Sequence, residues 1–158
     1  MLPIKLLSRF NDIVDLDVLD NHGERKRFSR DFFDYSPILV TKLQTCIADL
    51  VVRPYTVDAV LEVAKICNKE EIPLTLRGSG TGNYGQCVPL QGGVVMHMSA
   101  LKKIRHIDQL SGQVTVESGC LMGDLNQQLL NYGRQLRLLP STWRNASIGG
   151  FIAGGSGG

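Results

Sequence analysis

The sequence predicts an α+β fold in which a short parallel βαβ unit precedes a mostly antiparallel sheet with helices. Two observations carry this prediction. Residues 49–76 show the order strand, helix, strand, whereas residues 93–119 contain three strand-like stretches with no helix between them. A chain of alternating strands and helices would continue the first pattern. The change therefore favours an α+β architecture over a doubly wound one.

The parallel unit is the best defined part of the pattern. Residues 49–54 (DLVVRP) form a short apolar run that ends at Pro54, because proline lacks the N–H that a ladder needs. Thr56 is a suitable N-cap for a helix over residues 57–70, and residues 72–76 form the next strand. The helix carries apolar residues at helical spacing, namely Val57, Val60, Leu61, Ala64 and Cys67. Since a helical crossover joins the two strands, we expect them to be parallel.

Short turns connect the strands of the second half. Residues 93–99 and 104–108 read as strands, and residues 110–112 (LSG) supply a turn. Residues 113–119 alternate polar and apolar side chains, which is typical of a half-buried strand. A helix is expected from about Leu121, with Gly133 as its C-cap. Its apolar face comprises Met122, Leu125 and Leu129.

Residues 1–46 are mixed in character and only weakly periodic. We interpret them as an N-terminal extension of short helices and loops that wraps a single domain spanning residues 47–158. A length of 158 residues is sufficient for one domain with one hydrophobic core.

Composition and charge exclude several classes of protein. The 17 basic and 15 acidic residues are scattered, apart from a short run at residues 24–30, so no nucleic-acid partner is expected. No apolar run approaches the roughly 20 residues of a spanning helix, and the N-terminus does not resemble a signal peptide. We therefore expect a cytoplasmic protein without a transmembrane segment. The four cysteines form no C-x-x-C pair, which argues against a disulfide framework and a metal site, and Cys67 is expected in the core.

The loop after residue 76 contains the G-x-G-x-x-G pattern of a dinucleotide-binding Rossmann turn, at residues 80–85. That turn requires a helix opening within the loop and an acidic residue about 20 positions later. Pro89 interrupts the expected helix, and residues 101–105 contain no acid, so the Rossmann interpretation fails. The P-loop and kinase patterns are absent as well.

The same loop retains the chemistry of an anion site. Closely spaced glycines permit positive φ and let consecutive backbone N–H groups form a nest for phosphate oxygens. Short polar side chains lie between them, at Ser79, Thr81 and Asn83. The alternative is a flexible surface loop.

A second glycine-rich stretch, residues 147–158, is apolar between its glycines, as expected of backbone lying along a flat ligand. The alternative there is a linker, although Ile148, Phe151 and Ile152 are poor linker residues.

Two glycine-rich segments in this order resemble the FAD-binding domain of the vanillyl-alcohol oxidase / p-cresol methylhydroxylase (PCMH) superfamily. Residues 77–104 are similar to the family's pyrophosphate loop and following strand. Residues 114–129 are similar to its Val-x-Val-x-x-Gly strand and helix, and residues 140–158 to its second flavin segment. Within the superfamily, the branch of 2-hydroxy-acid dehydrogenases, with the glycolate oxidase flavin subunit and the D-lactate dehydrogenases, is the most similar.

This resemblance implies FAD as cofactor and a set of residues that bind it. The pyrophosphate would be held by the first loop, comprising Arg77, Gly78, Ser79, Gly80, Thr81, Gly82, Asn83 and Tyr84. Gly119 would lie near the adenine or ribose. The isoalloxazine and ribityl chain would be lined by Pro140, Ser141, Thr142, Ser147, Ile148, Gly149 and Gly150. Some members attach FAD through a histidine where this chain has Thr81, so non-covalent FAD is expected, with Cys87 as the nearest candidate nucleophile.

The implied activity is oxidation of a small 2-hydroxy acid by hydride transfer to flavin N5. Family members are longer and carry a cap domain that supplies the substrate pocket, so we expect this chain to be truncated on its C-terminal side. No catalytic residue can be assigned, and His97 and His106 are interpreted as structural. Two alternatives stay open: a truncated or split FAD-binding module that is inactive alone, and an enolpyruvyl nucleotide-sugar reductase-like flavoenzyme. A partner chain or a homodimer is also left open.

Overall fold

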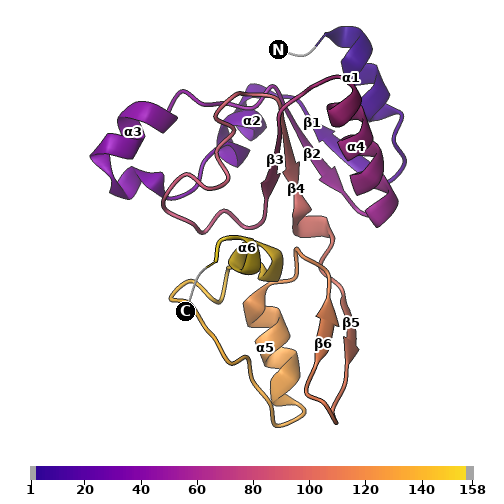
Figure 1. The fold of residues 1–158 in the computed structure, drawn as a ribbon, viewed down its shortest axis with the longest axis vertical. Helices are drawn as coiled ribbons and strands as arrows, with labels where there is room; N and C mark the ends of the chain where they lie inside the picture. The colour runs from indigo at the N-terminus through magenta and orange to yellow at the C-terminus, as the bar shows by residue number, and fades with distance from the viewer. Residues whose placement is uncertain (1–2, 156–158) are drawn as a thin grey trace.

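The computed structural model describes residues 3–155, which form two lobes joined end to end (Figure 1). The large lobe contains α1 (Ile4–Asn11), β1 (Leu16–Leu19), α2 (His22–Phe28), the 3₁₀ turn η1 (Phe33–Tyr35), α3 (Pro37–Leu43), β2 (Leu50–Pro54), α4 (Val57–Lys69), β3 (Leu74–Arg77) and β4 (Val94–His97). The 3₁₀ turn η2 (Met98–Ala100) follows β4 and packs on the core of the large lobe through Met98. The small lobe contains β5 (Ile104–Ile107), β6 (Val114–Val116), α5 (Met122–Leu130) and α6 (Ile148–Ala153).

The large lobe is built on a four-stranded sheet in the order β1-β2-β4-β3. Strands β2 and β3 are both parallel to β4, which lies between them, with Leu50 and Leu74 each opposite Val94. The predicted parallel orientation of β2 and β3 is therefore confirmed, although the two strands are not neighbours. The predicted α+β class is confirmed as well, because a separate antiparallel pair, β5 and β6, follows.

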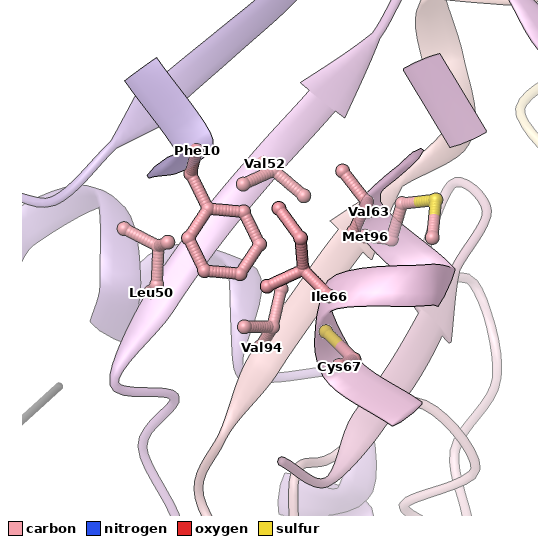
Figure 2. Packing of buried hydrophobic residues seen from close by; sticks show 8 residues of the cluster. All are labelled: Phe10, Leu50, Val52, Val63, Ile66, Cys67, Val94 and Met96. Carbon is pink, nitrogen blue, oxygen red and sulfur yellow. The ribbon is translucent and has the colours of Figure 1, made fainter. Parts of the chain in front are cut away.

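Helices α1 and α4 cover one face of the large sheet (Figure 1). Figure 2 shows the core between them, where Phe10 of α1 and Val63 of α4 meet Leu50 and Val52 of β2. Cys67 is buried in this cluster, as predicted. Helix α4 is amphipathic, but its buried face comprises Ala59, Val63, Ile66 and Cys67, whereas Val57 and Leu61 of the predicted face are exposed. Thr56 caps α4 by accepting a hydrogen bond from the Ala59 N–H at 3.2 Å, as predicted.

The opposite face of the sheet is covered by the N-terminal residues. Phe28 at the end of α2 packs with Ala48, Val51 and Val95. Strands β2 and β4 are thus buried on both faces, which explains their continuous apolar runs.

One element of the N-terminal segment contradicts the prediction of short helices and loops alone. Residues 16–19 form β1, which pairs antiparallel with β2 at the edge of the sheet. The alternation of Val14, Leu16 and Val18 with Asp15 and Asp17 was the sequence signal for a strand. Arg53 of β2 also forms a hydrogen-bonded ion pair with Asp17, so polar side chains fix this edge as well.

The small lobe has its own core. Leu125 and Leu129 of α5 pack against Ile104 of β5 and Val116 of β6. The predicted C-cap is confirmed in detail: Gly133 has φ +65°, and the backbone N–H of Arg134 donates to the Leu129 carbonyl at 3.1 Å. Helix α6 also belongs to this lobe and lies at its junction with the large lobe (Figure 1).

Within residues 3–155, none of the helices is both long and apolar enough to span a lipid bilayer.

Candidate functional site: a cleft between two glycine segments

A cleft of about 590 Å³ lies where the loop after β3 faces the segment that leads into α6. This volume falls within the range of small-molecule and cofactor sites, about 300–1,000 Å³. The cleft brings together two stretches that are more than 50 residues apart in the sequence. Its lining includes the predicted residues Gly78, Ser79, Gly80, Thr81, Gly82, Asn83, Tyr84, Pro140, Ser141, Thr142, Ser147 and Gly150.

Four predicted residues are not in the lining. Arg77 is buried beneath the loop, Ile148 and Gly149 lie in the first turn of α6, and Gly119 packs against the backbone of Met98 and Leu101. Gly119 and Gly149 are sites of close backbone packing: a Cβ on Gly119 would lie 2.0 Å from the Met98 carbonyl oxygen, and one on Gly149 would lie 2.8 Å from the Ser118 carbonyl oxygen. These glycines position the strands and α6. Any direct cofactor contact from the four remains a prediction.

The first glycine loop contains no helix. The element after β3 is β4, so the objection that Pro89 raised to a Rossmann turn is confirmed. Gly80 and Gly85 have φ of +72° and +80°, in the left-handed region that other residues rarely occupy. Gly80 and Gly85 thus provide left-handed residues of the kind that a nest includes, and the nest itself stays a prediction.

Two glycine positions of the loop, Gly78 and Gly80, leave no space for a side chain. A Cβ on Gly80 would lie 2.1 Å from Nη2 of Arg77, and one on Gly78 would lie 2.2 Å from Oγ of Ser147. The second contact joins the two glycine segments directly. It places the N-terminus of α6 against the first residue of the loop.

Arg77 forms a positively charged floor under this loop. Its Nη1 donates hydrogen bonds to the carbonyls of Phe28, at 3.3 Å, and Arg30, and approaches the Cys87 sulfur at 3.1 Å. Its Nε is buried and has no hydrogen-bond partner among the described residues. A buried cation with an unused donor favours an anion nearby.

His97 lies beside this floor, at the position opposite Arg77 in the β3–β4 register. Its ring packs on Phe28 with the centroids 4.5 Å apart. Burial, reinforced by the positive charge of Arg77, lowers the pKa of His97 to about 4. His97 is therefore neutral at physiological pH, whereas His106 is exposed on β5.

Two titratable residues in the lining were not predicted as cofactor ligands. Asp31 comes from the N-terminal segment, and no motif in the sequence points to it. Cys87 was considered only as a nucleophile. Burial raises the pKa of its thiol, and the nearby Asp31 acts in the same direction while Arg77 opposes it. A protonated thiol is a weak nucleophile, which favours non-covalent binding.

The second glycine segment forms a short helix that the sequence analysis did not predict. Ser147 is its N-cap and accepts a hydrogen bond from the Gly150 N–H at 3.3 Å. A serine followed by a periodic apolar run was the available signal. The last residues of the predicted segment, 156–158, lie outside the described residues.

A second cleft, of about 500 Å³, lies between α1 and α4 and is lined by residues such as Arg9, Asp12 and Glu62. It has neither a glycine nor a nest in its lining, so the cleft between the glycine segments is the stronger candidate. Among residues 3–155, no group of three or more histidine, cysteine or acidic side chains is placed to hold a metal ion.

Residues 48–158 match the family model described as an FAD binding domain, and the chain therefore belongs to this family. The resemblance inferred from the motifs is confirmed, and FAD is the cofactor. The mitochondrial D-lactate dehydrogenase [cytochrome] of Arabidopsis thaliana is 29% identical over 152 residues, covering 96% of this chain and 25% of that protein. The glycolate oxidase subunit GlcD of Bacillus subtilis is 31% identical over 110 residues, covering 70% of this chain and 23% of that protein.

Solved structures show the same fold. An alkyldihydroxyacetonephosphate synthase has a TM-score of 0.84 at 18% identity, covering all of this chain and 33% of that chain. A p-cresol methylhydroxylase has a TM-score of 0.74 at 22% identity, covering 94% of this chain and 28% of that chain. The PCMH-type fold predicted from the sequence is confirmed. The chain spans about a quarter of the length of the curated relatives named above.

The cleft fits an FAD molecule on three structural grounds. The loop has two left-handed glycines, it lies against the second glycine segment at Gly78 and Ser147, and a buried arginine with an unpartnered Nε lies below it. The loop backbone at residues 78–84 would hold the pyrophosphate. Residues 140–142, Ser147 and Gly150 would then contact the remaining part of the cofactor.

Proposed function

We propose that this chain is the FAD-binding part of a flavin-dependent oxidoreductase that oxidises a small 2-hydroxy acid. The observation that carries the proposal is the single cleft that the two glycine segments form together. Relatives named D-lactate dehydrogenase and glycolate oxidase subunit support the substrate class. When bound, FAD would supply a two-electron acceptor for the hydride that leaves the hydroxyl-bearing carbon.

Sequence relatives support this substrate class more strongly than fold similarity does. One solved structure with the same fold is named a synthase, and a shared fold does not imply a shared reaction. The two sequence relatives, by contrast, both carry the name of an enzyme acting on a 2-hydroxy acid.

The proposed role of this chain is to bind and orient the cofactor. Backbone N–H groups of the loop and the charge of Arg77 would neutralise the pyrophosphate, while the apolar residues of α6 would exclude water from one side of the cleft. Groups that bind the substrate carboxylate and accept its hydroxyl proton are proposed to lie outside the described residues or in a partner chain. A homodimer and a cytoplasmic location remain part of this proposal.

The test is a visible absorption spectrum of the purified chain after addition of FAD and removal of excess cofactor. The proposal predicts retained flavin bands at about one FAD per chain, and release of free FAD on acid precipitation. Bleaching by D-lactate or glycolate under anaerobic conditions would identify the substrate class. Absence of bound flavin would contradict the proposed function altogether. Retained flavin that neither acid reduces would instead favour a module that is inactive alone.

A further inference from the structure

Residues 28–33 precede the matched family region, which begins at residue 48, and yet they contact the glycine loop at several points. The backbone N–H of Phe32 donates to the Gly82 carbonyl at 2.8 Å. The carbonyl of Phe28 accepts a hydrogen bond from Arg77 under the loop. The 28–33 segment thus forms the outer support of the loop, while β3 and β4 support its ends.

Asp31 makes the most specific of these contacts. Its Oδ2 accepts a hydrogen bond from the Gly85 N–H at 2.9 Å, and its Oδ1 accepts one from the Phe33 N–H at 3.0 Å. The side chain is only 7% exposed. Both carboxylate oxygens are therefore fixed, and hydrogen bonds to an ionised acceptor are stronger than neutral ones.

The Asp31 carboxylate lines the cleft, next to a loop that is suited to binding phosphate. A negative charge at such a place opposes binding of an anion by simple electrostatics. Its hydrogen bond to Gly85, a residue with φ +80°, has the opposite consequence because it fixes the far end of the loop at a residue in the left-handed conformation. Repulsion and positioning therefore predict effects of opposite sign when the charge is removed.

We propose that Asp31 is a positioning residue for FAD binding, which holds the loop in its binding conformation before the cofactor arrives. A loop that is only partly in this conformation binds more weakly in proportion to the competent fraction. The inference rests on the assignment of this cleft as the FAD site. It adds a residue from outside the family region to the determinants of affinity.

The first test compares FAD dissociation constants of the full chain and two variants, measured by quenching of flavin fluorescence. Asp31→Asn places an amide beside the Gly85 N–H and is expected to raise the dissociation constant about tenfold, the effect of one charge-assisted hydrogen bond. Asp34→Asn is the matched control, because Asp34 is exposed, pairs with the Arg30 side chain and does not line the cleft. It should change the constant less than twofold. An unchanged or lower constant for Asp31→Asn would overturn the proposal.

Hydrogen exchange measured by mass spectrometry separates positioning from general destabilisation. In the FAD-free wild-type chain, the Gly85 amide, resolved by overlapping peptides within residues 78–87, should already be protected because it donates to Asp31, and exchange of this amide at the rate of an unstructured peptide would overturn the proposal without any variant. In Asp31→Asn, exchange should rise in these peptides and not in α4. Equal acceleration in α4 would instead indicate loss of the fold and overturn the positioning role. If wild-type protein does not bind FAD, the proposed function itself fails; if it does and Asp31→Asn binds equally well, only this inference fails.

Discussion

The two glycine segments that border the cleft look alike in the sequence but use glycine differently. In residues 78–85, Gly80 and Gly85 have positive φ, the segment has no helix, and its contacts come from Arg77 and the 28–33 segment. In residues 147–155, Gly149 and Gly150 are helical, and their small size lets α6 approach Ser118 and Gly78 closely. The first segment needs glycine for its backbone conformation and the second for close packing.

This difference matters for binding. Backbone at positive φ presents N–H groups to a ligand, whereas glycines in a closely packed helix bring one wall of the cleft against the other. Substitutions in the first segment should therefore affect FAD affinity, and substitutions in the second should affect stability first.

The largest effect is expected for Gly149→Ala. The new Cβ would lie 2.6 Å from Cβ and 2.8 Å from the carbonyl oxygen of Ser118, so α6 must shift. We expect the free energy of unfolding to fall by about 3 kcal/mol, the upper part of the usual range for overpacking. Urea denaturation would measure this change. The control Gly154→Ala, whose nearest contact is at 3.1 Å, should change the free energy by less than about 1 kcal/mol.

His97 is buried opposite Arg77, and protonation of its ring at low pH should be detectable as a loss of stability. The folded-state pKa of His97 is about 4, against an ordinary value of 6.5. The unfolded chain therefore binds a proton that the folded chain rejects, and stability is lost as the pH falls from about 6.5 towards 4. We expect a loss on the order of 2 kcal/mol over this range.

Denaturation in urea at several pH values would check this. The variant His97→Gln should show a flatter profile between pH 6.5 and 4 than the wild type. Replacing the exposed His106 by Gln should leave the profile as it is, and equal profiles for all three proteins would rule out His97 as the cause.

Gly80 and Gly155 have the same left-handed backbone conformation but different surroundings. Their φ angles are +72° and +62°, but a Cβ would meet Arg77 at Gly80, whereas at Gly155 it would meet no atom of residues 3–155 within 4 Å. Both alanine variants should lose about 1 kcal/mol of stability from backbone strain, and Gly80→Ala about 1 kcal/mol more because its Cβ must displace the buried Arg77 side chain. Only Gly80→Ala should weaken FAD binding, by about tenfold, in a fluorescence titration. Equal effects of the two variants on affinity would remove the distinction between the segments.

The smallest effect is expected at the helix caps. Ser147→Ala removes the acceptor of the Gly150 N–H, and Thr56→Ala removes that of the Ala59 N–H in the large lobe. Each should lower the free energy of unfolding by about 1 kcal/mol. Since Ser147 lines the cleft and Thr56 does not, only Ser147→Ala should also change FAD affinity. Urea denaturation and FAD titration of both variants would measure the two effects. A weaker FAD affinity in Thr56→Ala would contradict the assignment of the affinity effect to the cleft.

Much of the fold could be predicted from the sequence because local patterns determine it. Each of these features depends on residues close together in the chain: the helix after Thr56, the apolar strands at residues 50–54 and 94–97, and the left-handed Gly133 that follows the end of α5. The insertion of β4 between β2 and β3 could not be predicted, since pairing partners of buried strands share no distinctive sequence feature.

The site was predicted less completely, for a related reason. Glycine spacing and short polar residues identified the loop, and the resemblance identified residues 140–150. Asp31 and the burial of Arg77 depend on contacts across more than 45 residues, which no local pattern encodes. His97 was interpreted as structural, but its strongly lowered pKa follows first from its burial and then from the proximity of Arg77 in the β3–β4 register, and both depend on the tertiary fold.

The central claim is that the two glycine segments together hold FAD. Hydrogen exchange of the full chain with and without saturating FAD tests it most directly. The structure predicts added protection in residues 78–87 and 140–150 together, with no change in the second cleft between α1 and α4. Protection confined to α1 and α4, or to only one of the glycine segments, would contradict it.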